Sequence, residues 1–203
     1  MYVDAFNLYY GCLKDTPYRW LDLSAFCHAA LPRDSIGHIR YFTALVSARS
    51  YNPDQPTRQR VYLRALATLP VVTVHYGQFL SSVVTMPLAE PRPGHAKFAR
   101  VRKSEEKGSD VNLAAHLLCD AYENKFDRAV VVTNDSDLVE PIRLVNERLR
   151  KPVGVLCPKR RPSFELRKVA AFTRPIREGV LRVSQFPSEL CDAVGTFHKP
   201  ARW

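Results

Sequence analysis

The sequence lacks the features that mark a disulfide-stabilised, zinc-binding or membrane-spanning protein. Its five cysteines are odd in number and never form a C-x-x-C pair, which argues against a disulfide framework and against a zinc site. No apolar run approaches the length of a membrane span, and Met1 leads to Asp4 without a basic and apolar leader. We therefore expect small buried cysteines in a reducing compartment, and a cytoplasmic protein that does not contact a membrane.

Acidic residues are outnumbered, 20 against 30 basic residues in a chain of 203. The excess is uneven, because Arg143 to Arg182 holds twelve basic and three acidic residues and so carries nine of the ten net positive charges. A localised basic field predicts a surface for a polyanion, most often a nucleic acid. The alternative interpretation is a solubilising face without a partner. The hydrophobic content of 46% fits one compact α/β domain with a small appendage.

Apolar runs of strand length alternate with segments of helical periodicity, and the chain shows no internal repeat and no low-complexity tract. The expected strands are Tyr2–Val3, Ile39–Val46, Val71–Tyr76, Phe98–Arg102, Ala129–Thr133 and Val153–Leu156. The expected helices are Ser24–Ala30, Pro56–Thr68, Ser109–Glu123 and Ser136–Leu149. This alternation predicts an α/β fold, a Rossmann-like three-layer sandwich with a mainly parallel central sheet.

The remaining segments are less regular. Prolines 87, 91 and 93 and Gly94 predict an irregular loop over Val83–Ala96. Beyond Pro158 we expect a basic helix over Ser163–Ala171 and a short strand over Val180–Val183. We predict one catalytic domain over residues 1–157 and a basic C-terminal extension over residues 158–203 that packs on or beside it.

Four aspartates are expected to meet at one edge of the sheet. Asp135 and Asp137 follow one Val-rich strand, Asp4 follows another, and Asp110 lies in the first turn of the helix after Gly108. In an open parallel sheet, function collects where strands end at their carboxyl ends. Carboxylates gathered there would repel one another, and a divalent cation removes the conflict. Oxygen ligands of this kind favour Mg²⁺ or Mn²⁺.

The same acids are open to other interpretations. Taken singly, each aspartate has an ordinary role as a helix N-cap, a first-turn dipole partner or a turn former. A calcium loop is excluded, because Val139 and Glu140 stand where an oxygen ligand and then a glycine are needed. A phosphotransfer fold with a nucleophilic Asp4 lacks its second acid, because Phe6 stands at that position.

Three segments resemble the motifs of a known family. Tyr2–Gly11 (YVDAFNLYYG), Lys103–Ala114 (KSEEKGSDVNLA) and Val130–Leu138 (VVVTNDSDL) are similar to the three motifs of the NYN domain family, a branch of the PIN-like nucleases that includes the bacterial LabA-like proteins. The similarity continues through Arg58–Phe79 and covers roughly residues 1–156. Family members usually have several apolar residues before the first-strand aspartate, whereas only three residues precede it here. Either this chain starts late or upstream residues are missing.

The resemblance implies a metal-dependent ribonuclease. The metal-binding and catalytic residues carried over from the family are Asp4, Asp110, Asp135 and Asp137, with Asn7 as a polar contact to metal-bound water or phosphate. One or two Mg²⁺ or Mn²⁺ ions would polarise the scissile phosphate and activate a water.

Four basic residues are expected to bind the substrate. Lys107 would neutralise charge on the phosphate, and the run Lys159, Arg160 and Arg161 just past the last core strand would grip the backbone. The alternative for each of these side chains is that it is simply solvated.

The implied partner is single-stranded RNA, with DNA left open. Phe6, Tyr9 and Tyr10 are candidates to stack on unpaired bases, although packing in the core is an alternative role for Phe6. A second hypothesis is a non-catalytic nucleic-acid-binding or regulatory module that retains the fold. The sequence leaves the oligomeric state open and is compatible with a homodimer.

Overall fold

The computed structural model describes residues 1–48, 50–90, 96–201 and 203. At its centre is a six-stranded sheet in the order β3-β2-β1-β6-β7-β8, in which neighbouring strands are parallel. The strands are β1 (Tyr2–Asp4), β2 (Ile39–Thr43), β3 (Val72–Tyr76), β6 (Ala129–Val132), β7 (Val153–Cys157) and β8 (Thr173–Pro175). The predicted α/β fold with a mainly parallel central sheet is confirmed.

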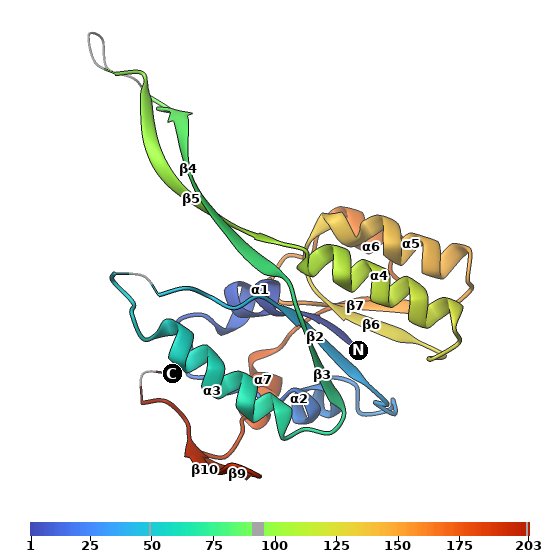
Figure 1. Ribbon diagram of the computed structural model, residues 1–203. Helices are drawn as coiled ribbons and strands as arrows, with labels where there is room; N and C mark the ends of the chain where they lie inside the picture. The colour runs from blue at the N-terminus through green and yellow to red at the C-terminus, as the bar shows by residue number, and fades with distance from the viewer. Residues whose placement is uncertain (49, 91–95, 202) are drawn as a thin grey trace.

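Helices cover both faces of this sheet (Figure 1). One face carries α2 (Leu23–Ala30), α3 (Gln55–Ala67) and α7 (Glu178–Val183). The other carries α4 (Ser109–Tyr122), α5 (Val139–Glu147) and α6 (Phe164–Val169). The three layers leave the strand ends as the places where functional side chains can gather.

The central strand β6 shows why its sequence is continuously apolar. Val130 and Val132 pack into the core on the α2, α3 and α7 side, whereas Ala129 and Val131 pack into the core under α4, α5 and α6. Successive side chains of a strand point to opposite faces, so a strand covered on both sides needs apolar residues at every position. β6 is therefore a rigid element that fixes the residues following it.

At the carboxyl ends of β1 and β6 the chain turns at once into short helical segments. β1 leads into α1 (Ala5–Leu8) and a single π-helical turn, η1 (Tyr9–Leu13). A short loop after β6 leads into the 3₁₀ turn η2 (Ser136–Leu138) and then α5. β1 and β6 are neighbours in the sheet, so these two turns lie next to each other.

The strands β4 (Gln78–Pro87) and β5 (Phe98–Lys107) form an antiparallel hairpin that projects from the body (Figure 1). The predicted loop over Val83–Ala96 is wrong for residues 83–87, which belong to β4, and its Pro91, Pro93 and Gly94 lie outside the described residues. The expected strand Phe98–Arg102 exists but belongs to this hairpin, not to the central sheet.

The reason for this error lies in the hairpin's own geometry. Val83, Val84 and Thr85 favour a strand, and each has a partner on β5. Pro87 is tolerated because both strands of a two-stranded ribbon are edge strands, so a missing N–H need not break a ladder. The irregular segment expected from Val83 therefore cannot begin before the end of β4 at Pro87.

Residues 158–203 pack against the body at several points. β8 extends the central sheet beside β7, and Leu166 of α6 is buried under α5. The strand predicted over Val180–Val183 is wrong, because these residues belong to helix α7. In a strand Leu181 and Val183 would share one face, whereas here Leu181 is buried in the core on the α2 side and Val183 is 70% exposed. Short apolar runs do not distinguish helix from strand. The division of the chain at residue 157 stays a prediction.

A small antiparallel hairpin, β9 (Glu189–Asp192) and β10 (Gly195–His198), ends the described chain. Asp192 accepts two hydrogen bonds of 2.7 Å from Arg64 of α3, which ties this hairpin to the body. Among the described residues, no helix has the length and apolar character that crossing a membrane requires.

Candidate active site

The carboxylate of Asp4 is held at the carboxyl end of β1 and is only 3% exposed. Its Oδ1 accepts from the backbone N–H of Asn7 at 2.9 Å, and its Oδ2 accepts from Asn7 Nδ2 at 2.7 Å and from Thr133 Oγ1 at 3.2 Å. Burial raises the pKa of Asp4, the hydrogen bonds oppose that rise, and the charge of Asp135 adds to it. The side chain is thus fixed in direction and sits in an environment unfavourable to its negative charge.

The turn after β6 brings Asp135 beside this carboxylate. Its backbone N–H donates to Thr133 Oγ1 at 3.0 Å, and the same hydroxyl donates to Asp4. Asp135 Oδ1 accepts from the backbone N–H of Asp137 at 3.0 Å and so caps η2. Asn134 is tied in through its N–H, which donates to Asn7 Oδ1 at 3.2 Å. One small network of hydrogen bonds therefore links the turns after β1 and β6.

Asp110 approaches from the first turn of α4. The turn before this helix requires Gly108, whose φ of +93° is in the left-handed region that favours glycine. The pKa of Asp110 is raised to about 6, first by burial and then by the negative charges of four nearby carboxylates, those of Asp4, Asp135, Glu106 and Asp137. This acid therefore lies in a crowded field of like charge.

A hollow of about 550 Å³ collects these groups. Asp4, Asp110 and Asp135 all line it, together with Asn7. Asp137 is exposed and is not among the residues that line this hollow. Its negative charge still acts on the site, because it helps to raise the pKa of Asp110. We call this hollow the acid pocket.

The acid pocket offers carboxylate oxygens, the kind of donor that hard divalent cations prefer. None of Asp4, Asp110 and Asp135 forms an ion pair with a described residue. In the part of the chain that the structure describes, no three His, Cys, Asp or Glu side chains already form a group that could hold a metal ion. Mg²⁺ is usually held by only one or two carboxylates, with water and substrate phosphate supplying the other ligands. The prediction that Asp4, Asp135 and Asp137 share one cation stays a prediction.

The basic residues expected to bind the substrate do not line the acid pocket, and their role stays a prediction. Lys107 is exposed, and its Nζ is 3.3 Å from Glu105 Oε2, because it lies on the face of β5 that Glu105 shares. The other three, Lys159, Arg160 and Arg161, are exposed as well.

The run Lys159, Arg160 and Arg161 nevertheless stays close to the pocket. It follows β7 at the same sheet edge, and Asn134 Oδ1 accepts from the backbone N–H of Ser163 at 2.7 Å. That hydrogen bond holds the basic segment near the turn after β6. Lys159, Arg160 and Arg161 do not line the acid pocket and form no ion pair with its carboxylates. Their role in gripping the RNA backbone stays a prediction.

Sequence reasoning missed one wall of the pocket, which the β4–β5 hairpin supplies. The wall consists of Phe79, Ser81, Arg102, Ser104 and Glu106. The signal was present, because alternate residues from Arg102 to Glu106 lie on one face of a strand that leads directly to Asp110. The expected strand stopped at Arg102 and hid this alternation. Glu106 also caps α4, since its Oε1 accepts from the backbone N–H of Ser109 at 3.1 Å.

Aromatic rings form part of the lining of the acid pocket. Phe6 and Tyr10 line it, Phe6 packs edge-on against Phe79 with ring centroids 5.6 Å apart, and Tyr10 is 57% exposed. A smaller hollow of about 110 Å³ adjoins it and shares Phe6 and Tyr10. Its other aromatic lining residues are Tyr9, Tyr41, Tyr62 and Trp203. These side chains form a surface next to the acids on which a planar ligand ring can stack.

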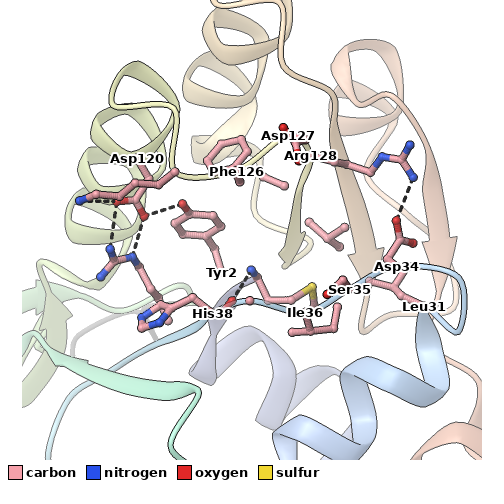
Figure 2. A pocket seen from close by; sticks show the side chains of 16 residues that line it. Tyr2, Leu31, Asp34, Ser35, Ile36, His38, Asp120, Phe126, Asp127 and Arg128 are labelled. Atoms are coloured by element: carbon pink, nitrogen blue, oxygen red, sulfur yellow. Dashed lines mark hydrogen bonds and ion pairs between the residues drawn. The ribbon is translucent and has the colours of Figure 1, made fainter.

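A larger hollow of about 750 Å³ lies at the opposite, amino-terminal edge of the sheet (Figure 2). There Tyr2 Oη donates to Asp120 at 2.7 Å, and the guanidinium of Arg40 donates to both carboxylate oxygens at 2.7 and 2.9 Å. Arg128 pairs with Asp34 at 3.0 Å across the same hollow. The charged groups named here pair with one another. The carboxylates that line the acid pocket have no basic partner among the described residues, so the acid pocket is the candidate for chemistry.

The chain is similar to known proteins in sequence and in fold. The model of the NYN domain matches residues 1–176. The chain is 30% identical to 6-hydroxy-3-succinoylpyridine 3-monooxygenase HspA of Pseudomonas putida (strain DSM 28022 / S16), and the match covers 100% of this chain and 74% of the relative. A crystal structure of a protein of unknown function from Vibrio parahaemolyticus has the same fold, with a TM-score of 0.55 at 22% identity over 87% of this chain and 91% of that one.

Proposed function

Because the chain belongs to the NYN domain family, within the PIN-like superfamily, we propose that it is a metal-dependent ribonuclease that hydrolyses phosphodiester bonds of single-stranded RNA. One observation carries the proposal: carboxylates from three separate elements, Asp4, Asp110 and Asp135, line one pocket, and none of them pairs with a basic side chain of the described residues. In keeping with this crowding, the pKa values of Asp4 and Asp110 are raised. Perturbed acids in a hollow at the carboxyl edge are typical of a functional site.

In this proposal Asp4 and Asp135 hold Mg²⁺ or Mn²⁺, and Asp110 and Asp137 complete the acidic surroundings. A bound divalent ion would supply Lewis acidity, lowering the pKa of a water and balancing charge on the phosphate. Asn7 keeps the Asp4 carboxylate in one orientation through two hydrogen bonds. Fixed ligand direction is what lets a site align water and phosphate for in-line attack.

Asp110 has a further role in this scheme. Its carboxylate lines the same pocket as Asp4 and Asp135 and would orient a metal-bound water. Arg102 is a basic side chain of the pocket wall and is placed to contact a substrate phosphate. Phe6 and Tyr10 offer rings against which an unpaired base can stack. RNA and free thiols are both in keeping with a cytoplasmic location.

The experiment that tests the proposal is incubation of the purified chain with labelled single-stranded RNA, single-stranded DNA and duplex RNA, in Mg²⁺, in Mn²⁺ and in EDTA. We expect cleavage of single-stranded RNA with either metal and none in EDTA. Asp135→Asn should lower the rate at least about 100-fold, since it removes roughly 3 kcal/mol of charge stabilisation. Asp127→Asn removes one acidic charge at the opposite edge and should leave the rate unchanged. Equal rates for the two variants would reject the proposal.

A different activity is suggested by the relative's name. That protein is a monooxygenase of a substituted pyridine, and the aromatic hollow of about 110 Å³ beside the acid pocket is a place where a planar ring could bind. Monooxygenation needs O₂ and a two-electron reductant, commonly supplied through a flavin or nicotinamide cofactor. The test is 6-hydroxy-3-succinoylpyridine with NADH, with and without added flavin, analysed for a hydroxylated product. Product formation without RNA cleavage would favour this second candidate.

The third candidate is a nucleic-acid-binding module without turnover. The same RNA assay separates it from the nuclease, because such a module would retain a labelled oligonucleotide in a filter-binding measurement while leaving its length unchanged. The presence of all four family aspartates favours the nuclease.

A further inference from the structure

The β4–β5 hairpin has two long faces of different character. The strands pair from Gln78 opposite Lys107 to Pro87 opposite Phe98, and in the described chain no third strand joins them. Figure 1 shows the ribbon standing clear of the body beyond its base. An isolated two-stranded ribbon is marginally stable in water, so a hairpin of this length calls for a function that uses it.

The register assigns each side chain to a face. Directly opposed residues of an antiparallel pair lie on one face, and the next pair lies on the other. Phe79 and Glu106 form one such pair, and both line the acid pocket. Continuing outward on this face, the opposed pairs are Ser81 with Ser104, Val83 with Arg102, Thr85 with Arg100, and Pro87 with Phe98. We call this surface the guide face.

The guide face carries two arginines that form no ion pair with a described residue. Arg100 and Arg102 are exposed, and neither forms an ion pair with any described residue. On the opposite face, Lys103 and Lys107 both pair with Glu105. The lysines of the opposite face therefore share an acidic partner, whereas the two arginines of the guide face have no ion-pair partner among the described residues and are available to a ligand.

The outer end of the guide face adds an aromatic ring. Phe98 is 59% exposed, which is unusual for a large apolar side chain. Alternate residues of a strand are about 6.7 Å apart, so Arg102, Arg100 and Phe98 span about 13 Å. At about 3.4 Å per stacked nucleotide, that distance corresponds to about four nucleotides.

We propose that the guide face binds a single-stranded nucleic acid and leads its backbone into the acid pocket. Arg102 and Arg100 contact two phosphates of the backbone, and Phe98 stacks on a base farther out. The inference rests on the proposed function for its substrate, and it adds a binding track formed by the hairpin. Its chemistry is matched to an unpaired strand, because a duplex hides its base faces from Phe98.

Binding in EDTA tests the track apart from cleavage. The probes are fluorescein-labelled uridine oligonucleotides of four and of twenty residues, followed by fluorescence anisotropy between about 0.1 and 1 M KCl. Each single-strand phosphate contact contributes a salt slope of about 0.7, so two contacts are worth about 25-fold in affinity at 0.1 M relative to 1 M. The double variant Arg100→Gln with Arg102→Gln should bind RNA about 25-fold more weakly at 0.1 M KCl, and the slope of its salt dependence should be smaller by about 1.4. The control Lys97→Gln with Lys103→Gln should keep both the affinity and the slope of the parent chain.

Phe98→Ala provides a second measurement that charge cannot explain. It should weaken binding of the twenty-residue probe severalfold at high salt, because base stacking is not screened, and should affect the duplex of the same length less. Melting temperatures of all variants should match the parent chain, since these side chains are exposed.

The possible results separate the two proposals. Binding lost in the guide-face variant, in a chain that never cleaves RNA, keeps the track and removes the nuclease. Cleavage with equal binding by both double variants removes the track and keeps the nuclease. A change in oligomeric state on gel filtration, in place of a change in RNA binding, would show that the hairpin contacts a second copy and would overturn the track.

Discussion

Asn7 donates to both carboxylate oxygens of Asp4, from its backbone N–H at 2.9 Å and from Nδ2 at 2.7 Å. The side-chain oxygen of the same residue accepts from the N–H of Asn134 at 3.2 Å. A single asparagine therefore fixes the direction of the most buried acid of the pocket and joins the turns after β1 and β6. This arrangement makes Asn7 a positioning residue for Asp4.

Replacing Asn7 with Ala should lower RNA cleavage strongly and stability modestly. The change removes a hydrogen bond to a buried carboxylate and leaves the Asn134 N–H without its acceptor, at a cost of about 1–3 kcal/mol. Asn146→Ala is a matched control, because Asn146 also bridges two backbone groups, Val153 and Val169, away from the pocket. Urea denaturation should show similar losses for both, and activity per folded molecule should fall only for Asn7→Ala. Equal activity losses would make Asn7 a purely structural residue.

The raised pKa of Asp110 predicts how stability depends on pH. The folded state holds this proton with a pKa of about 6, above the ordinary value of 3.8, so it binds the proton more tightly than the unfolded chain does. The contribution of Asp110 is most favourable below about pH 4, declines between pH 4 and 6, and stays unfavourable above pH 6. Because the side chain is only partly buried, we expect about 1 kcal/mol.

Asp110→Asn should therefore raise the melting temperature at pH 7 in EDTA by about 2–4 °C while lowering nuclease activity. The gain should vanish at pH 4, where the parent carboxyl is also largely neutral in the folded state. Addition of Mn²⁺ should stabilise the parent chain more than the variant, because a bound cation favours the ionised form. A variant less stable than the parent at pH 7 would contradict the charge crowding that we infer.

The basic run Lys159, Arg160 and Arg161 should contribute to RNA affinity through charge alone. Changing all three residues to Gln should flatten the salt slope of RNA binding by about 2, at about 0.7 per phosphate contact, and should leave Mn²⁺ binding intact. The control changes the same amount of charge in loops that enter the sheet at its amino-terminal edge, through Gln at Arg33, Arg148 and Arg150. If the two triple variants lose the same affinity, the basic run is a solvated surface.

The network at the opposite edge should matter for stability and not for activity. Although burial opposes it, hydrogen bonds from Arg40 and Tyr2 lower the pKa of Asp120, so its stabilisation is present above about pH 4 and is lost as pH falls below that. Asp120→Asn should cost about 3 kcal/mol in urea denaturation at pH 7, because it leaves Arg40 without its charge partner. RNA cleavage per folded molecule should not change. Loss of cleavage would assign a functional role to the larger hollow.

The central sheet was predictable from sequence because its signals are local. The continuous apolar run of β6 requires burial on both faces, and Gly108 before Asp110 marks a turn that only glycine makes easily. Together these place the acids at one edge. Their convergence on one pocket could be argued from topology, since parallel strands end at the same side.

What the sequence did not predict depends on contacts between distant segments. Glu106 was not among the predicted site residues, and its place in the pocket follows only from the pairing of β5 with β4. The strand expected over Val180–Val183 became a helix because α7 packs against α2. Asp137 lies in the same turn as Asp135, in the 3₁₀ segment η2, but only Asp135 is among the residues that line the pocket. Side-chain directions of this kind are set by tertiary structure.

The most direct test of the acid pocket as a metal centre is the position of Mn²⁺ in crystals of this chain, located by anomalous X-ray scattering. We expect a peak inside the pocket, about 2.1 Å from carboxylate oxygens of Asp4 and Asp135, which disappears in crystals of Asp135→Asn and persists in Asp127→Asn. A chain that shows no peak there at millimolar Mn²⁺, or shows one only in the hollow at the opposite edge, would contradict the account.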